Sequence, residues 1–529
     1  MVEARFVETV VSVDAATGRE LKRIAVTEPR QMTEVMERAR EAQRKWEKMS
    51  IYQRARLLAT LREVIYRRRH EIGRMVSAET GKPRAESILT EVMLALDSVE
   101  FFARRAPDWL RKENVPHHNL ALKAKRGWMQ FEPYGVVAVI SPWNYPFAIP
   151  VSAIAPALVA GNAVVLKPSE LTPQTGELIG EIFDQAAAAV GAPRELLQIA
   201  QGGGGVGAAL IAARPTKVFF TGSVATGKRV AGMCAERLIP SVLELGGKDA
   251  MIVMEDANLE VASSAAVWGA FTNCGQACLS VTRIYVQEEV AAQFLELVVE
   301  KTRKLRLGGP RDVEAEIGPM IRESQVVKIE RQLREAVDEG AEIKCGGKRR
   351  TDLGPTFFEP TVLVVRDEST RIMREETFGP VVAVASFATV EDAVRMANAT
   401  EYGLSASVWT RDTREGERVA SRLRAGSVMV NDVGSYYGIC EAPHGGSGAS
   451  GWGRTHSRLG LLETVRVKYV DVDELPGVRK PWWFGYGGRF AEASEALTEM
   501  LFARGWRERM SALRVAGRAL GVVFRGNKI

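Results

Sequence analysis

Five short apolar segments alternate with helix-like stretches between residues 135 and 245, and this alternation constrains the fold more than any other feature. The segments read GVVAVI, AVVLKP, LLQIA, KVFF and SVLEL. Continuously apolar strands separated by helices are typical of a parallel sheet that helices cover on both faces. The pattern restarts with AMIVM after Gly246-Gly247-Lys248 and runs on to SVMVND at 427–432. We therefore predict an α/β fold, with a doubly wound parallel-sheet domain and a second α/β domain.

Residues 30–112 predict a layer of amphipathic helices. From Arg54 to Val76, apolar residues recur every three to four positions, and Gly81-Lys82-Pro83 breaks the pattern. Two other segments alternate as extended strands do, namely 119–132 and TVRVKYVDV at 464–472. We expect these two segments to form a small β arm.

The stretch from Pro133 to Leu166 contains no charged residue and is long enough to cross a bilayer. Four prolines within it would interrupt a spanning helix, so we predict a strand, a turn and a helix that ends at Gly161-Asn162. The N-terminus lacks the basic-then-apolar pattern of a secretory signal. Five scattered cysteines give no disulfide framework, which indicates a reducing compartment and a cytoplasmic protein.

The net charge of +6 is confined to the C-terminal end. Residues 478–529 hold ten Lys or Arg and four Glu, so residues 1–477 are neutral overall and give no support for nucleic-acid binding. In the last helix-like segment, apolar and basic residues follow different stripes. The apolar stripe is Trp506, Met510, Leu513, Gly517, Leu520 and Phe524. Such a helix can lie on an anionic membrane surface, or it can cover a neighbouring subunit or the mouth of a substrate tunnel.

Cys278 is the candidate nucleophile. It follows Gly275-Gln276 between a predicted helix and a predicted strand, where a turn of small residues can expose a thiol. The alternative is a buried apolar cysteine. Cys274 and Cys278 have no nearby histidine or further cysteine, so no metal site is predicted.

Two polar side chains stand where strands end. Glu244 closes an apolar strand before a Gly-Gly turn, and a carboxylate among apolar neighbours can serve as a general base. An ion pair with Lys248 is the alternative. Asn144 lies between Pro142 and Pro146 and can supply a rigid oxyanion donor. A cap of the next helix is the alternative there.

Three stretches resemble dinucleotide contacts, although none is a GxGxxG motif. Lys167-Pro-Ser169-Glu170 ends a strand and can reach ribose hydroxyls. Gly222-Ser223 opens a helix that can face a pyrophosphate. QGGGGVG at 201–207 fits a flexible turn equally well.

The ordered set of motifs resembles the aldehyde dehydrogenase superfamily over about residues 5–475. The matching pieces are ETGKP at 79–83, SPWNYP at 141–146, GNAVVLKPSE at 161–170, FTGS at 220–223, LELGGK at 243–248, GQAC at 275–278, EETFGPV at 375–381 and SGWGR at 450–454. The resemblance implies the hydrolytic NAD(P)+-dependent branch, which oxidises an aldehyde to a carboxylic acid. NAD+ is the expected cofactor because Glu170 would repel a 2′-phosphate, although NADP+ is also compatible with this motif.

The resemblance also assigns roles. Cys278 matches the nucleophile, Asn144 the oxyanion donor and Glu244 the base that activates water. The implied cofactor contacts are Trp143, Lys167, Ser169, Glu170, Gly222, Ser223, Leu245, Glu376 and Phe378. The implied assembly is a homodimer or homotetramer, and apolar residues after Asn144 favour an apolar aldehyde.

The implied domains are a cofactor domain over 1–118 and 136–246, a catalytic domain over 247–450, an oligomerisation arm over 119–135 and 460–476, and a basic extension over 477–529. His444 stands where many family members have Phe, and we favour a loop histidine over a residue that lines the substrate tunnel. For Cys274 we favour packing over an inactivating disulfide. Two alternatives to a dehydrogenase stay open: a cysteine acyltransferase or esterase without redox turnover, and a non-catalytic structural or membrane-surface protein on the same scaffold.

Overall fold

The computed structural model describes residues 8–119, 122–478, 480, 483–484 and 486–525. The chain divides into two compact units, which we describe separately. The first unit consists of residues 1–111 and 131–467, and the second consists of residues 112–130 and 468–529. Residues 120–121 of the predicted arm lie outside the described residues.

A six-stranded sheet in the first unit has the order β19-β9-β8-β5-β6-β7. Its strands β5 to β9 are parallel, and β19 pairs antiparallel with β9. The order runs outward in both directions from β5, as in a doubly wound sheet. The strands are β5 (Val136–Ile140), β6 (Ala163–Lys167), β7 (Leu197–Ile199), β8 (Lys217–Thr221), β9 (Ser241–Glu244) and β19 (Gly451–Trp452). All five apolar segments singled out in the sequence are strands of this sheet.

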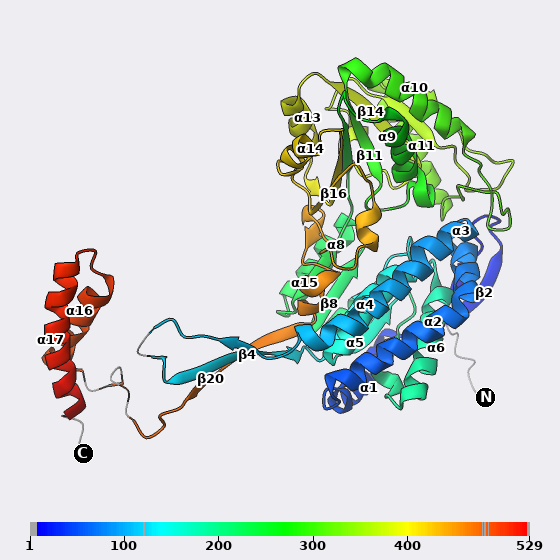
Figure 1. Ribbon diagram of the computed structural model, residues 1–529. Coiled ribbons are helices and arrows are strands. Elements are labelled where there is room, and N and C mark those ends of the chain that lie inside the picture. The colour runs from blue at the N-terminus through cyan, green and yellow to red at the C-terminus, as the bar shows by residue number, and fades with distance from the viewer. Residues whose placement is uncertain (1–7, 120–121, 479, 481–482, 485, 526–529) are drawn as a thin grey trace, which may run out of the picture. The chain divides into compact units, whose positions relative to one another are not determined.

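Helices surround the six-stranded sheet in more than one layer. Helices α5 and α6 contact its strands, and α2 and α4 pack outside them (Figure 1). Helices α1, α7 and α8 also contact the sheet. The helices are α1 (Met32–Trp46), α2 (Ile51–Thr80), α3 (Arg84–Ser87), α4 (Leu94–Trp109), α5 (Ala148–Ala160), α6 (Pro173–Val190), α7 (Gly204–Ala212) and α8 (Val224–Ala235), with the π-helix η2 (Ile88–Met93) before α4. The predicted helical layer at 30–112 is thus confirmed.

Two buried carboxylates stabilise the starts of α5 and α6. Glu79 accepts the backbone N–H groups of Gln174 and Thr175 at the first turn of α6. Glu91 accepts those of Phe147 and Ala148 at the start of α5, while its other oxygen pairs with Lys82. A carboxylate at a helix N-terminus satisfies free N–H donors and complements the helix dipole. Glu79 of the ETGKP segment and Glu91, which pairs with Lys82 of that segment, therefore fix the starts of the two helices that follow β5 and β6.

The uncharged run from Pro133 to Leu166 folds as β5, α5 and β6, as predicted. Helix α5 ends at Gly161, whose φ of 102° is left-handed. Across the described residues, no helix is both long and apolar enough to cross a membrane.

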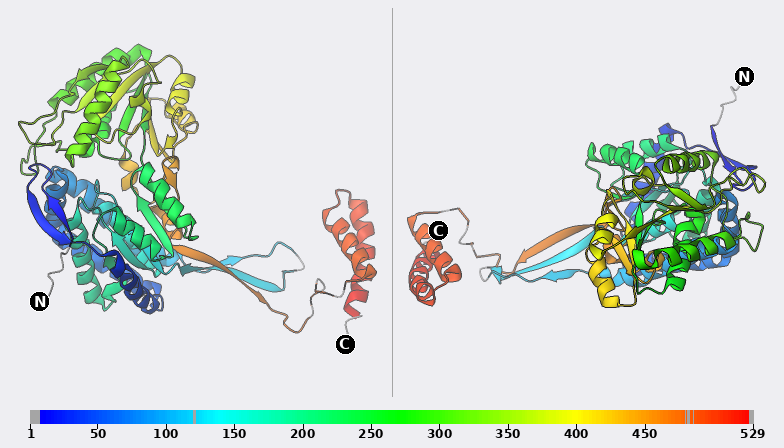
Figure 2. Two further views of the ribbon diagram at one scale, coloured as in Figure 1. Left: turned by 180° about the vertical axis from the view of Figure 1, so that it is seen from behind. Right: turned by 90° about the horizontal axis from the view of Figure 1, so that it is seen from above.

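The second sheet of the first unit has seven strands in the order β12-β13-β14-β11-β10-β16-β17. All neighbouring pairs are parallel except β12 with β13. Helices α9, α10 and α11 cover one face, and α13 and α14 cover the other (Figures 1 and 2). The strands are β10 (Asp249–Val253), β11 (Val281–Gln287), β12 (Glu342–Cys345), β13 (Thr361–Val364), β14 (Val381–Phe387), β16 (Ser405–Trp409) and β17 (Ser427–Val430). The helices are α9 (Leu259–Phe271), α10 (Glu288–Lys304), α11 (Glu323–Asp338), α13 (Val390–Ala397) and α14 (Thr413–Ala420).

Short elements complete the first unit. They are the hairpin β1 (Thr9–Val13) with β2 (Glu20–Ala25), the pair β15 (Tyr402–Gly403) with β18 (Ser447–Gly448), and the helices α12 (Arg371–Arg374) and α15 (Ser457–Leu462).

The second unit contains a β ribbon and a helical hairpin. The ribbon has the order β20-β4-β3, with β3 (Glu113–Val115), β4 (Lys125–Pro133) and β20 (Val465–Asp473). The hairpin consists of α16 (Gly488–Phe502) and α17 (Trp506–Arg525), which pack on each other. Strands β4 and β20 lie where the sequence predicts an extended arm.

Candidate active site

One cavity of about 530 Å³ lies at the carboxyl ends of β5, β6 and β8 and at the start of α8. The strand order reverses between β5 and β8, and ligands of open α/β sheets bind at such a point. All twelve residues predicted for the site line this cavity: Trp143, Asn144, Lys167, Ser169, Glu170, Gly222, Ser223, Glu244, Leu245, Cys278, Glu376 and Phe378. The cavity therefore unites residues from both sheets of the first unit.

Cys278 lies between the short helix η5 (Thr272–Gly275) and β11. Two residues of η5, Asn273 and Cys274, have left-handed φ angles of 51° and 54°. Glu86 accepts the Asn273 N–H, and the Gln276 side chain donates to the Asn273 carbonyl at 3.1 Å. Those bonds hold the turn so that the thiol is only partly buried and faces the cavity. The alternative of a sealed apolar cysteine does not describe this geometry.

The surroundings of the Cys278 thiol oppose its ionisation. Burial raises the thiol pKa well above its ordinary value, and the carboxyl groups of Asp249, Glu244 and Glu376 add to the effect. The resting side chain is therefore a thiol at neutral pH, and a base must remove its proton before it can attack a carbonyl carbon.

Asn144 is tied directly to the turn that carries the thiol. Its side-chain amide donates to the Gln276 carbonyl at 3.0 Å, and the Asn273 amide donates to the Asn144 carbonyl at 3.0 Å. The alternative of a helix cap is not formed, because Phe147 is the N-cap of α5 and makes no side-chain cap bond. A carboxamide carries two N–H groups, and the bond to Gln276 uses one.

Glu244 ends β9 with its side chain buried. Neither carboxyl oxygen has a hydrogen-bond partner in the described structure. Desolvation raises the pKa of Glu244 well above its usual range. The alternative ion pair with Lys248 is absent among the described contacts of Lys248, whose ammonium donates to the Thr377 hydroxyl at 3.4 Å.

Gly246 and Gly247 permit the close approach of Glu376 and Cys278. A Cβ atom on Gly246 would lie 2.3 Å from a Glu376 carboxyl oxygen, and one on Gly247 would lie 2.2 Å from the Cys278 carbonyl oxygen. The Gly247 N–H also donates to Glu376 at 3.2 Å. Any larger residue at either position would separate the groups that line the cavity.

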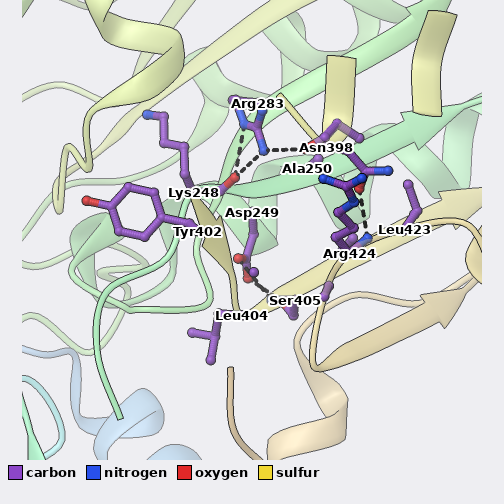
Figure 3. Close-up of a pocket in the computed structure, with 14 residues that line it drawn as sticks. Lys248, Asp249, Ala250, Arg283, Asn398, Tyr402, Leu404, Ser405, Leu423 and Arg424 are labelled. Carbon is purple, nitrogen blue, oxygen red and sulfur yellow. Dashed lines mark hydrogen bonds between the residues drawn. The ribbon is translucent and has the colours of Figure 1, made fainter. Parts of the chain in front are cut away.

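Buried charged side chains anchor the strand that follows Gly247. Figure 3 shows Arg283 directed toward the Lys248 carbonyl and the Asp249 carboxyl directed toward Ser405. The Arg283 guanidinium donates to that carbonyl at 2.6 and 2.9 Å, and the Ser405 N–H donates to Asp249 at 3.0 Å. Burial lowers the pKa of Lys248 to about 7 and raises that of Asp249 to about 7. This network fixes the β10 end of the Gly-Gly segment.

The chain matches the model of the aldehyde dehydrogenase family over residues 2–470. The chain belongs to the aldehyde dehydrogenase family. It is 37% identical to 4,4'-diapolycopene aldehyde oxidase of a Methylomonas species over 93% of this chain and 91% of that protein. It is 39% identical to a provisionally named NADP(+) succinate-semialdehyde dehydrogenase of Mycobacterium ulcerans over 91% of this chain and 93% of the relative.

Solved structures agree with this assignment. An NAD-dependent aldehyde dehydrogenase from Sinorhizobium meliloti superposes with a TM-score of 0.85 and 33% identity, over 90% of this chain and 93% of that one. The family match and the solved structures confirm the predictions of an α/β fold and of an NAD(P)+-dependent aldehyde dehydrogenase.

The large cavity of this aldehyde dehydrogenase has about 530 Å³, which is within the range of ligand sites, and charged, polar and apolar side chains line it. At one part of it, the Lys167 ammonium lies 3.1 Å from the Glu170 carboxylate, so a donor and an acceptor that could both reach ribose hydroxyls lie side by side. Elsewhere Ser223 caps α8 by accepting the Thr226 N–H, beside the helix end that suits a pyrophosphate. The residues present therefore fit NAD(P)+.

Sequence reasoning missed three cavity residues at the start of α11: Arg322, Gln325 and Lys328. Lys328 donates to the Glu376 carbonyl at 2.8 Å and so supports the Glu376 segment. The only available signal was a pair of basic residues near a helix start, which is a common surface pattern.

A second, smaller cavity of about 30 Å³ is also lined by Cys278 and Glu244. His444 lines it too and is only 4% exposed, so the expectation of an ordinary loop histidine is wrong. Ile149 lines this cavity, whereas Phe147 and Val151 pack in the hydrophobic core. Cys274 is buried with its sulfur 3.6 Å from the Met320 sulfur, which is the packing arrangement that we favoured.

Proposed function

We propose that this enzyme oxidises an aldehyde to the carboxylic acid by way of a covalent thioester on Cys278. The observation that supports this most is the convergence of Cys278, Asn144 and Glu244 at one cavity that also holds every predicted dinucleotide contact. A nucleophile, an oxyanion donor and a base within reach of one carbonyl carbon are what acyl transfer requires.

In the first step, the Cys278 sulfur bonds to the aldehyde carbon after a base removes the thiol proton. The carbonyl oxygen gains negative charge, which the Asn144 amide and the Cys278 backbone N–H stabilise by donating hydrogen bonds. The Asn144 side chain is already fixed by the Gln276 carbonyl, so little reorganisation is needed when the charge develops.

When bound, NAD(P)+ supplies the acceptor for the hydride that leaves the aldehyde carbon. Lys167, Ser169 and Glu170 would hold the adenosine ribose, and Gly222 with Ser223 the pyrophosphate. Trp143, Leu245, Glu376 and Phe378 would surround the nicotinamide half, where Trp143 and Phe378 already stack edge to face at 5.4 Å. Because Glu170 is a carboxylate, we propose a preference for NAD+.

In the last step, Glu244 removes a proton from water, and the water oxygen attacks the thioester carbon. The C–S bond breaks, the acid leaves, and the sulfur recovers a proton. Glu244 suits this role because its buried carboxyl group has a raised pKa and faces the same small cavity as Cys278. A cysteine esterase would have no use for the ribose and pyrophosphate contacts, which disfavours the non-redox alternative.

We propose an apolar aldehyde as the substrate. Val139, Ile149, Ala153, Phe219 and Val242 line the small cavity beside Cys278. The Methylomonas relative is named for diapolycopene aldehyde and the Mycobacterium ulcerans relative for succinate semialdehyde, so the proposal rests on the residues that line this cavity. We also propose that the enzyme is cytoplasmic. We propose further that it forms a homodimer or homotetramer through the arm of β4 and β20.

We also propose that the α16–α17 hairpin binds an anionic membrane surface. Among the hairpin residues whose side chains the structure describes, the buried ones are small, namely Ala493, Ala496, Ala512 and Ala516, and several large apolar residues are exposed. Phe502 and Trp506 are 75% and 71% exposed. Residues 478–529 carry the whole excess positive charge of the chain, which an anionic lipid surface attracts and the neutral remainder of the chain does not.

The dehydrogenase proposal is tested by the absorbance of reduced nicotinamide. We expect the purified enzyme to form NADH from NAD+ with apolar long-chain or aromatic aldehydes, and a Cys278→Ala variant to lose at least a thousandfold in kcat, the order expected when a nucleophile is removed. Absence of NADH with short, aromatic and long-chain aldehydes, or full activity of Cys278→Ala, would contradict the proposal.

A further inference from the structure

Arg322 is a cationic residue of the large cavity that the proposed function does not use. It lies directly before α11 and lines the cavity together with Lys167 and Glu170. Its side chain is exposed, and its guanidinium forms no hydrogen bond or ion pair with any described residue. A guanidinium has five N–H donors, so Arg322 offers all of them to an anion that enters the cavity.

The backbone that leads into Arg322 is held by buried contacts. The Ile321 N–H donates to the buried Gln276 side chain, on the turn that carries the nucleophile, at 3.0 Å. A Cβ atom on Gly318 would lie 2.1 Å from the Gly81 carbonyl oxygen, so these two stretches of backbone are in direct contact. Arg322 therefore reaches the cavity from a fixed point of the backbone.

These contacts place Arg322 on the side of the cavity that is proposed for the adenosine ribose. The loop that its backbone contacts also carries Glu79, which accepts the Thr175 N–H at 2.9 Å, shortly after Glu170 in the chain. The charge of Arg322 is felt at Glu170 itself. Although burial opposes ionisation there, the pKa of Glu170 is lowered by the Lys167 ammonium and, to a smaller extent, by Arg322.

Helix α11 extends from Arg322 toward the other part of the cavity. Lys328 of this helix donates to the Glu376 carbonyl at 2.8 Å, in the part proposed for the nicotinamide half. Because a helix rises about 1.5 Å per residue, Arg322 and Lys328 are roughly 9 Å apart along α11. The two cations therefore serve different parts of one elongated site, and Arg322 belongs to the part that contains Glu170.

We propose that Arg322 binds the 2′-phosphate of NADP+ and offsets its repulsion by Glu170, so that NADP+ is a second cofactor of this enzyme. The inference rests on the proposed function, which assigns the adenosine ribose to Lys167 and Glu170. Lys167 already pairs with Glu170 at 3.1 Å, so Arg322 is not needed to neutralise this carboxylate. Its planar fork of N–H groups matches the oxygens of a phosphate, which can accept two parallel hydrogen bonds.

The test measures binding by isothermal titration calorimetry to the full wild-type chain and to Arg322→Gln. The ligands are NAD+, NADP+, adenosine 5′-monophosphate and adenosine 2′,5′-bisphosphate. Within each pair the ligands differ only in the 2′-phosphate. We expect Arg322→Gln to raise the Kd of NADP+ and of the bisphosphate about tenfold or more, as for loss of a hydrogen bond to a charged group. The Kd values of NAD+ and of the monophosphate should stay the same, which also shows that the variant is folded.

Arg334→Gln is the matched control. Arg334 is an exposed arginine of α11 that lies outside the set of residues lining the cavity, so its replacement removes the same charge from the same helix. We expect all four Kd values to stay at their wild-type levels in this variant, because an exposed charge at a distance is screened by salt. In steady-state assays, the ratio of kcat/KM for NADP+ over NAD+ should fall in Arg322→Gln and not in Arg334→Gln.

Three results would overturn the inference: an equal loss for NAD+ and NADP+ in Arg322→Gln, which would assign Arg322 to the pyrophosphate or to the fold; an unchanged Kd of NADP+ in that variant; or an equal loss in Arg334→Gln. A wild-type chain that binds NAD+ but not NADP+ would overturn it as well. If the wild-type chain binds neither dinucleotide, the proposed function fails instead, so the two failures are distinguishable.

Discussion

At the scale of the residue, the Cys278 thiol is held in its protonated form by burial and by three neighbouring carboxyl groups. Because the thiol pKa is raised, its thiolate fraction should grow about tenfold for each pH unit through the neutral and mildly alkaline range. Iodoacetamide alkylation of the cofactor-free enzyme, followed on the Cys278 peptide by mass spectrometry, should therefore accelerate without a plateau from pH 7 to pH 9. A plateau below pH 8 would show a thiolate at rest and contradict this account.

Glu170 gives a second prediction at this scale, which concerns cofactor choice. Replacing Glu170 with Gln removes a negative charge from the place proposed for the ribose hydroxyls, while the side chain keeps its size. We expect the ratio of kcat/KM for NADP+ over NAD+ to rise about fivefold, which corresponds to roughly 1 kcal/mol of lost repulsion. Glu177→Gln in α6, which removes the same charge from an exposed pair with Lys22, is the control. An unchanged ratio would remove Glu170 from the cofactor site.

Most functional residues could be predicted from the sequence because they stand at strand ends and in short motifs. His444, Gln325 and Lys328 could not be assigned in this way. His444 lies in a glycine-rich loop, where its backbone forms an antiparallel bridge with Thr455 and its side chain is buried. Gln325 and Lys328 reach the cavity from a helix of the other sheet, through contacts that no local pattern encodes.

At the scale of the element, the start of α5 depends on the buried Lys82–Glu91 pair. The two charged atoms are 2.5 Å apart, and both side chains are fully buried. Glu91→Gln should destabilise the protein by about 3–5 kcal/mol, because it leaves the Lys82 ammonium without its buried partner. Urea unfolding measures this loss. Arg67→Ala, which breaks an exposed pair with Glu63, should cost less than about 1 kcal/mol. Equal midpoints for both variants would contradict the prediction.

The strands of both sheets and the long helices that cover them could also be predicted, because an apolar strand or an amphipathic helix is recognisable from its own residues. The capping roles of Glu79 and Glu91 could not be predicted, because the helix N-termini that they cap, those of α6 and α5, lie far along the chain. In α17, Ala512 and Ala516 are buried, whereas Met510 and Leu513 of the predicted apolar stripe are about half exposed. The side chains of Leu520 and Phe524 lie outside the described residues.

At the scale of the whole molecule, the proposed membrane contact depends on the last fifty residues. We expect the full chain to cosediment with vesicles of phosphatidylglycerol and phosphatidylcholine, and not with phosphatidylcholine alone. Removing residues 477–529 should abolish sedimentation and leave NADH formation from a short aldehyde intact. Arg507→Glu/Arg514→Glu should weaken binding more than Trp506→Ala does at low salt, since each basic residue near an anionic surface contributes about 1 kcal/mol. Equal binding to neutral vesicles, or no binding, would contradict the proposal.

The central claim is that an acyl thioester on Cys278 is an obligatory intermediate and that Glu244 is needed to hydrolyse it. Intact-protein mass spectrometry of Glu244→Gln, after mixing with NAD+ and an accepted aldehyde, tests it most directly. The account predicts one NADH per active site and one acyl group on each chain, located on the Cys278 peptide. Continuous turnover with unmodified protein, or an acyl group on another residue, would contradict it.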